Sequence, residues 1–258
     1  MLDMKVLKQA LDKEYEYYEI EDSTKLIRYM SFDKFISILE NKRLYLTRAD
    51  KFEDPLEGII PNWYREKFNH RFTLPEGLLE KVFRYYGDSK QKSIGQRLIE
   101  NERVLRENAY VSCWNKMTTE SYALWKIYAS GNGVAIQTRK TNIDKILKGT
   151  GAKVFKIRYN PSDKHTVVPD IEGSFNDFTD LKNFLVCKQE HYTYEQEVRI
   201  ILIDKGGKNE IPIPDLAQFI EKIYVSPFAD SWFMTLVKKV VKETYNLDIE
   251  ITNSDIKL

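Results

Sequence analysis

The chain has 258 residues, 42% of them hydrophobic, and a formal net charge of +1 at pH 7. This length and composition predict one large domain or two small ones, and the balanced charge excludes a global basic field for nucleic acid. The two cysteines lack metal-binding spacing and the three histidines are scattered, so we expect no metal and a reducing compartment. No apolar leader or membrane-length run is present, which predicts a cytoplasmic protein without a membrane partner.

The N-terminal part of the chain is predicted to form a strand–helix–strand unit followed by a polar loop. The elements are a strand at 25–30, a helix at 32–40 capped by Ser31, and a strand at 44–47. The loop at 48–58 contains Asp54 and Glu57, which are typical of turn and helix-cap positions. Residues 61–108 then carry apolar side chains at three- and four-residue spacings, which predicts a mainly helical insert.

The later elements contain more strands than a regular alternation of strands and helices allows. Strands are predicted at 109–114, 134–138, 153–159, 198–203, 211–214, 223–226 and 249–252, and helices at 120–130, 143–147, 178–191 and 231–245. A hairpin-like join is expected at 203–211, and Thr118 or Thr119 is expected to cap the helix at 120–130. We therefore predict a single α+β domain over 1–258 around a mixed or antiparallel sheet.

An aromatic stripe marks the predicted helix at 120–130. Tyr122, Trp125 and Tyr128 lie near one helical face, with Leu124 beside them. Such a stripe is more typical of a buried core than of a ligand site.

The segment at 194–203 carries the most unusual arrangement of charge. Alternation puts Glu195, Glu197 and Arg199 on one face of a strand and apolar side chains on the other. Both faces are apolar at the far end, which is typical of an interior strand. Buried charges need partners or a ligand, so the cluster is either a structural ion pair or the floor of an active site. From the residues alone, both interpretations stay open.

Three blocks of sequence together resemble the bacterial DUF2971 family, whose name assigns no reaction. The blocks are Leu26-Ile27-Arg28-Tyr29-Met30-Ser31 with the loop at 52–57, Val111-Ser112-Cys113-Trp114 with the segment at 120–136, and Lys188 with Tyr194-Glu195-Gln196-Glu197-Val198-Arg199. More remotely, a strand with Arg28, a strand with Ser112 and a strand opening with Glu-x-Glu resemble the arrangement of ADP-ribosyltransferases. That resemblance implies a split sheet around a cleft that holds NAD as a substrate.

The resemblance also implies roles for individual residues. Glu197 is the candidate that stabilises the oxocarbenium-like ribose, and Glu195 would orient or deprotonate an acceptor. Arg28 would bind the pyrophosphate, although a structural bridge to either glutamate is the plain alternative. Ser112 would contact the ribose or brace Glu197. Nicotinamide needs an aromatic wall, for which the candidates are Tyr29, Tyr45, Trp114 and Trp125.

Several functions follow from these expectations. An enzyme of this kind would transfer ADP-ribose to a protein or nucleic acid, or to water as an NAD glycohydrolase, and would suit a toxin or phage-defence effector with an antitoxin or regulatory partner. One alternative is a non-catalytic module that binds a nucleotide or a partner. Another is a metal-dependent nuclease that uses Asp54, Glu57, Glu195 and Glu197 as magnesium ligands.

Overall fold

The computed structural model describes residues 20–52, 54, 57–59, 102–116, 118–160 and 185–258. The chain divides into two compact units, a smaller one of residues 1–18, 48–109 and 158–191 and a larger one of residues 19–47, 110–157 and 192–258. Residues 102–108 are helical, but the rest of the predicted insert at 61–108 lies outside the described residues. The expected single domain with a helical insert therefore stays a prediction.

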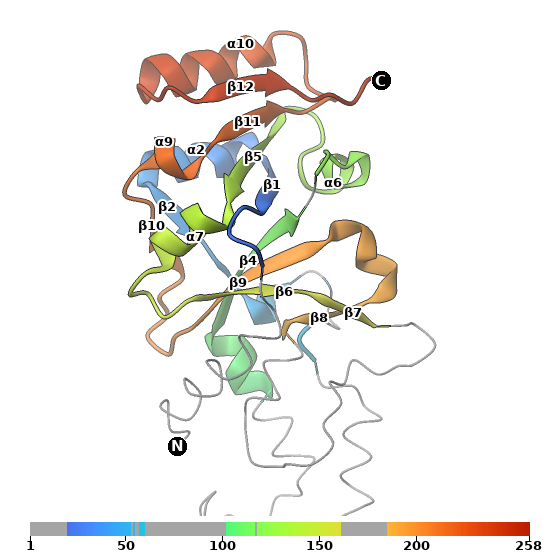
Figure 1. Cartoon of the computed structure of the whole chain (residues 1–258), viewed down its shortest axis with the longest axis vertical. Coiled ribbons are helices and arrows are strands. Elements are labelled where there is room, and N and C mark those ends of the chain that lie inside the picture. The colour runs from blue at the N-terminus through green and yellow to red at the C-terminus, as the bar shows by residue number, and fades with distance from the viewer. Residues whose placement is uncertain (1–19, 53, 55–56, 60–101, 117, 161–184) are drawn as a thin grey trace, which may run out of the picture. The chain divides into compact units, whose positions relative to one another are not determined.

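The larger unit is built around a mixed sheet with the strand order β12-β11-β5-β1-β4-β9-β6 (Figure 1). Its strands are β1 (Lys25–Ser31), β4 (Ala109–Lys116), β5 (Gly133–Arg139), β6 (Lys153–Lys156), β9 (Glu197–Ile203), β11 (Lys222–Val225) and β12 (Glu250–Asn253). The β11–β12 pair is parallel, whereas the β1–β5, β5–β11 and β6–β9 pairs are antiparallel. The predicted α+β class with a mixed sheet is confirmed.

The sheet splits between β1 and β4. All seven residues of β1 pair with β5, from Lys25 to Ser31. Against β4, only Leu26 and Ile27 pair, opposite Lys116 and Asn115. From Arg28 onward β1 no longer pairs with β4, and β4 pairs with the short strand β3 (Thr47–Arg48) as well.

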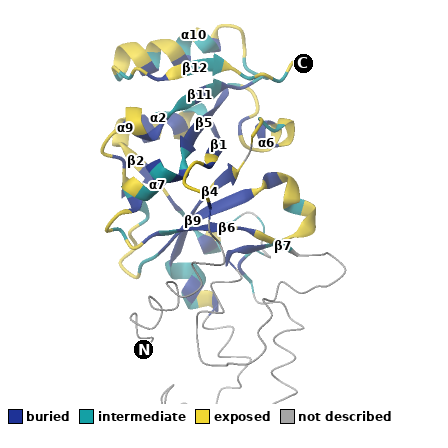
Figure 2. Cartoon of the chain, in the orientation of Figure 1, coloured by how far each residue is buried: buried dark blue, intermediate teal, exposed yellow. Residues whose placement is uncertain are grey.

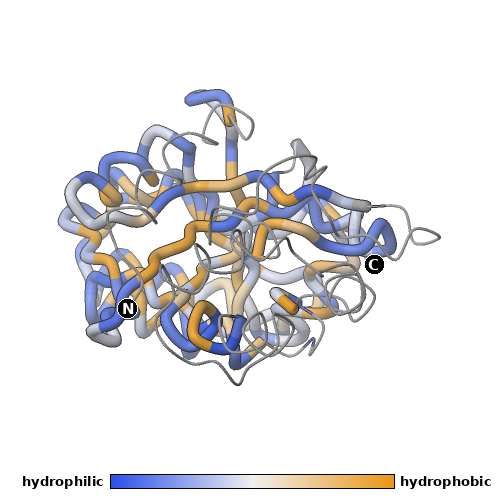
Figure 3. Tube along the Cα trace, turned by 90° about the horizontal axis from the view of Figure 1, so that it is seen from below, coloured by the Kyte–Doolittle hydropathy of each residue, from blue (hydrophilic) through white to orange (hydrophobic). Residues whose placement is uncertain are grey.

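Two apolar clusters cover the two faces of this sheet. The main core joins the even-numbered residues of β1, β4 and β9 to the helices α2 (Phe32–Asn41), α7 (Lys140–Leu147), α9 (Leu216–Phe219) and α10 (Phe233–Lys238). A smaller cluster on the other face joins Ile27, Tyr29 and Ala135 to Leu124 and Trp125 of α6 (Tyr122–Tyr128). Figure 2 shows β9 buried along its length, and Figure 3 shows apolar strands beside helices of alternating hydropathy.

The expected hairpin at 203–211 is wrong. The strand β10 (Glu210–Pro212) pairs with β2 (Arg43–Tyr45) in a separate two-stranded sheet. Leu44 and Ile211 face each other there and are fully buried in the main core. Their burial favours this long-range pairing over a local return of the chain onto β9.

The predicted strand at 153–159 and the predicted helix at 178–191 also differ from the structure. The strand is interrupted at Ile157, whose N–H donates to the backbone carbonyl of Glu197, and continues as β7 (Arg158–Asn160). Where the helix was expected, the described part holds β8 (Cys187–Gln189), which pairs in parallel with β7. A short 3₁₀ helix, η3 (Glu190–Glu195), then precedes β9. Backbone pairing with β7 outweighs the helical spacing of the side chains.

Several short elements and helix ends lie between the longer strands and helices. The strand β3 (Thr47–Arg48) is followed by the 3₁₀ turn η2 (Ala49–Lys51). The predicted helix at 231–245 is α10 followed by a π-helical segment, η4 (Lys239–Thr244), in which the Tyr245 N–H donates to Val240. Ser121, rather than Thr118 or Thr119, caps α6, because its side chain accepts from the Leu124 N–H.

Candidate active site

Arg199 and Glu197 form a buried ion pair at the start of β9. The guanidinium donates from Nε and Nη2 to the two carboxylate oxygens, at 2.7 and 3.0 Å. The side chains are 0% and 2% exposed. The prediction that Arg199 neutralises one of the glutamates is confirmed. Two parallel hydrogen bonds fix the plane of the Glu197 carboxylate as well as its charge.

Glu195 lies just before β9 in a turn that β4 holds in place. Its carbonyl accepts from Asn115 Nδ2 at 2.8 Å, and the next carbonyl, of Gln196, accepts from the Lys116 N–H at 2.9 Å. Gln196 has a φ of 41°, a left-handed conformation that few residues other than glycine adopt without cost. The Glu195 carboxylate Oε1 accepts from the Tyr128 hydroxyl at 3.4 Å. Hydrogen bonds thus hold both glutamates, from Arg199 to Glu197 and from Asn115 and Tyr128 to Glu195.

Arg28 lies where the sheet splits, and no acidic side chain in the described part of the chain pairs with it. Its guanidinium carbon is 5.9 Å from the centre of the Trp114 ring, a cation–π distance. Within the described chain, it makes no hydrogen bond or ion pair, so the structural bridge to Glu195 or Glu197 is not formed. Burial lowers the pKa of the guanidinium, and the nearby Cys113 thiol partly opposes that shift. A half-buried cation without a counter-charge is typical of a site that binds an anion.

Ser112 and Trp114 belong to the face of the main core. Ser112 is fully buried and accepts from Trp114 Nε1 at 3.1 Å. Trp114 packs edge-on against Phe219, with ring centres 5.9 Å apart. Alternation places Ser112 and Glu197 on opposite faces of the sheet. The Ser112 hydroxyl therefore does not brace the Glu197 carboxylate, which Arg199 holds instead. A role for Ser112 in a reaction stays a prediction.

The four candidate wall residues for nicotinamide lie in three environments. Tyr29 and Trp125 pack edge-on in the smaller cluster, with ring centres 5.0 Å apart. Trp114 lies in the main core, and both tryptophans are fully buried. Tyr45 is 51% exposed on β2. The structure brings only Tyr29 and Trp125 together.

Tyr29 and Trp125 also fix the start of α6. The Tyr29 hydroxyl accepts from the Ser121 N–H at 2.9 Å, and burial raises the pKa of Tyr29 to about 12. Trp125 Nε1 donates to Glu120 at 2.8 Å, and Glu120 in turn accepts from the Asp255 N–H at 2.9 Å. The core interpretation of the aromatic stripe is therefore right for Trp125 alone, since Tyr122 and Tyr128 are 50% and 45% exposed.

Sequence reasoning missed three residues on the face that carries Glu197. They are Asn115, which holds Glu195, Tyr128, which contacts its carboxylate, and Cys113, which is exposed on a central strand. Because Cys113 is exposed, none of the described helices covers that point of the face. Alternation along β4 separates Cys113 and Asn115 from Ser112 and Trp114, but it does not reveal which pair shares a face with Glu197. Nothing local links Tyr128 to a residue far along the chain.

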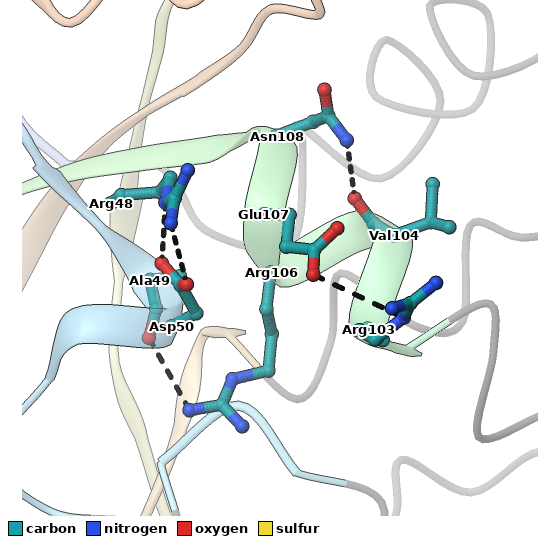
Figure 4. A network of polar contacts seen from close by, with 8 residues as sticks. All are labelled: Arg48, Ala49, Asp50, Arg103, Val104, Arg106, Glu107 and Asn108. Carbon is teal, nitrogen blue, oxygen red and sulfur yellow. Dashed lines mark hydrogen bonds and ion pairs between the residues drawn. The ribbon is translucent and has the colours of Figure 1, made fainter.

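A second polar network lies in the smaller unit (Figure 4). Arg48 donates twice to Asp50, at 2.6 and 2.9 Å, and these hydrogen bonds lower the pKa of that carboxyl. Arg106 Nη2 donates to the Ala49 carbonyl at 3.5 Å, while its buried Nε finds no hydrogen-bond partner among the described residues. The short helix at 102–108 is therefore tied to the turn after β3.

The nuclease alternative gains no support from the described residues. They contain no group of three or more His, Cys, Asp or Glu side chains that could hold a metal ion. Glu57 is paired with Lys188 at 3.3 Å, and Glu197 is paired with Arg199. Both carboxylates already have a cationic neighbour.

Within the residues that the structure describes, no helix is long and apolar enough to cross a membrane.

Comparison with protein-family models and with curated proteins finds no match, so membership of the DUF2971 family stays a prediction. Among solved structures, one match is DarT from Thermus sp. 2.9 in complex with carba-NAD+. The two chains are 12% identical, the match covers 91% of this chain and 97% of that one, and the TM-score is 0.39. The assignment of function therefore rests on this chain's own residues.

Proposed function

We propose that the chain is an ADP-ribosyltransferase-like enzyme that cleaves NAD and transfers ADP-ribose to a protein or nucleic acid. The observation that carries this proposal is Arg28, a half-buried guanidinium that pairs with no acidic side chain among the described residues, at the point where β1 parts from β4. A pyrophosphate is an anion that a planar guanidinium binds through paired hydrogen bonds. The sequence resemblance to ADP-ribosyltransferases starts at this same arginine.

The two glutamates supply the chemistry that the bond cleavage needs. As the bond between nicotinamide and ribose breaks, positive charge develops on the ribose, and a fixed carboxylate stabilises that charge. Arg199 fixes the plane of the Glu197 carboxylate through two hydrogen bonds. Glu195, held in the preceding turn, accepts the proton of the incoming acceptor. With water as the acceptor, the same groups make the enzyme an NAD glycohydrolase.

The remaining candidates have supporting roles in this proposal. Tyr29 and Trp125 form a buried aromatic pair in the smaller cluster, and Ser112 accepts a hydrogen bond from Trp114, whose ring lies next to Arg28. A toxin or phage-defence role with an antitoxin or other regulatory partner belongs to the same proposal. It predicts that expression of the wild-type chain, but not of the Glu197→Gln variant, arrests growth of a bacterial host.

The direct test is release of nicotinamide from NAD by the purified chain, with and without cell lysate or RNA as a source of acceptors. We expect turnover that persists in chelator and is lost in Glu197→Gln. Glu243→Gln is the matched control, because Glu243 is exposed and lies in η4. Turnover that chelator abolishes would contradict the proposal.

The ion pair gives one specific reason to keep a second candidate function. Because Arg199 neutralises Glu197, the site can hold a nucleotide without cleaving it. NAD binding that depends on Arg28, combined with no release of nicotinamide under any condition, would establish the non-catalytic module instead.

A further inference from the structure

Tyr128 contacts the proposed site from outside the sheet. It is the last residue of α6, its side chain is 45% exposed, and its hydroxyl donates to Glu195 Oε1 at 3.4 Å. The carboxylate it meets belongs to a residue that is only 4% exposed. A phenol that solvent reaches therefore contacts a carboxylate that is almost fully buried.

Several contacts hold α6 in the position that this requires. Its first turn is fixed by the Tyr29 hydroxyl on the Ser121 N–H and by the Trp125–Glu120 hydrogen bond. Its last turn ends against β5, because a Cβ on Gly133 would come within 2.6 Å of the Ala129 carbonyl oxygen. A helix fixed at both ends places the Tyr128 side chain reproducibly.

We propose that Tyr128 is a positioning residue for the transfer step, whose hydroxyl holds the Glu195 carboxylate toward the incoming acceptor. This inference rests on the proposed function. In the step, an acceptor oxygen or nitrogen forms a bond to C1′ of the ribose and its proton passes to Glu195. The bond from C1′ to nicotinamide breaks, and its electron pair leaves with nicotinamide.

The hydrogen bond matters more for a macromolecular acceptor than for water. Water is small and abundant, so it reaches a carboxylate in many orientations, whereas one group on a macromolecule has few productive orientations. Loss of the Tyr128 hydroxyl therefore lowers transfer more than hydrolysis. The distance of 3.4 Å is long for such a bond, and catalytic hydrogen bonds tighten when substrate is bound.

The test compares Tyr128→Phe with Tyr122→Phe, since both remove one hydroxyl from an exposed tyrosine of α6. Tyr122 is 50% exposed and its ring packs against Phe228, 5.4 Å between centres. We expect Tyr128→Phe to lower the ratio of transferred to hydrolysed ADP-ribose about tenfold, with the KM for NAD within about twofold of wild type. Tyr122→Phe keeps the wild-type ratio and KM.

Two results would overturn the inference. One is a wild-type ratio in Tyr128→Phe, and the other is a ratio that falls equally in both variants. If the wild-type chain releases no nicotinamide, the proposed function fails, and the contact is then tested by the ¹³C carboxyl resonance of Glu195. A change in that resonance in Tyr128→Phe, but not in Tyr122→Phe, shows that the hydroxyl orients the carboxylate although no transfer takes place, whereas no change overturns the contact itself.

Discussion

Arg28 lies with its guanidinium carbon 5.9 Å from the Trp114 ring, at the point where β1 leaves β4. No acidic side chain of the described residues pairs with it. An arginine that stabilised the fold through an ion pair would have such a partner, so its loss should affect ligand binding rather than folding.

We therefore expect Arg28→Gln to weaken NAD binding about 10- to 100-fold, because a charge-assisted hydrogen bond contributes about 1.5–3 kcal/mol. The free energy of unfolding should change by less than about 1 kcal/mol, the size of one cation–π contact. Calorimetric titration with NAD and urea unfolding measure the two quantities. Arg139→Gln is the control. Arg139 is the last residue of β5, lies opposite Lys25 of β1, and pairs with Glu221 at 2.7 Å.

The Arg199–Glu197 pair should behave in the opposite way. Removal of one partner leaves a buried charge, which costs about 3–5 kcal/mol. We expect Arg199→Met to lower the free energy of unfolding by that amount. The double variant Arg199→Met/Glu197→Gln should recover part of the loss, because no buried charge remains. Additive losses in a urea double-mutant cycle would show that the two side chains are not coupled.

Tyr29 predicts a loss of stability at alkaline pH. Burial raises its pKa from 10.0 to about 12, so between these values the unfolded chain loses the phenol proton and the folded chain keeps it. Stability that is fully present below pH 10 is therefore lost as the pH rises toward 12, by up to about 2 kcal/mol.

Tyr29→Phe should remove this part of the alkaline decline, while below pH 10 it costs about 1 kcal/mol through the lost hydrogen bond from the Ser121 N–H. Unfolding curves of both chains across this range measure the difference. Parallel declines in the two chains would contradict the assignment of this shift to Tyr29.

Local patterns predicted the strands that carry the site. β1 and β9 follow from their β-branched and apolar residues, and the pairing of Arg199 with a glutamate follows from strand alternation. Alternation within one strand says nothing about which strands are neighbours, however. It therefore left open that Ser112 and Glu197 face opposite sides of the sheet.

The long-range contacts were beyond a reading of the sequence. Tyr128 meets Glu195 only because α6 packs on β1 while β4 holds the turn before β9. The helical spacing of apolar residues at 178–191 predicts a helix where the structure has β8, because the partner strand β7 is distant in the chain. Each error comes from tertiary pairing that outweighs a local preference.

We propose that the carboxylates at the start of β9 support the cleavage of NAD. Nicotinamide release is measured for the wild-type chain, Glu197→Gln and Glu243→Gln, each checked for folding by thermal melting. We expect turnover by wild type and Glu243→Gln, and a loss of about 100-fold or more in folded Glu197→Gln, the effect of removing one charge-stabilising group. Equal turnover by folded Glu197→Gln and wild type would show that Glu197 has no part in the cleavage.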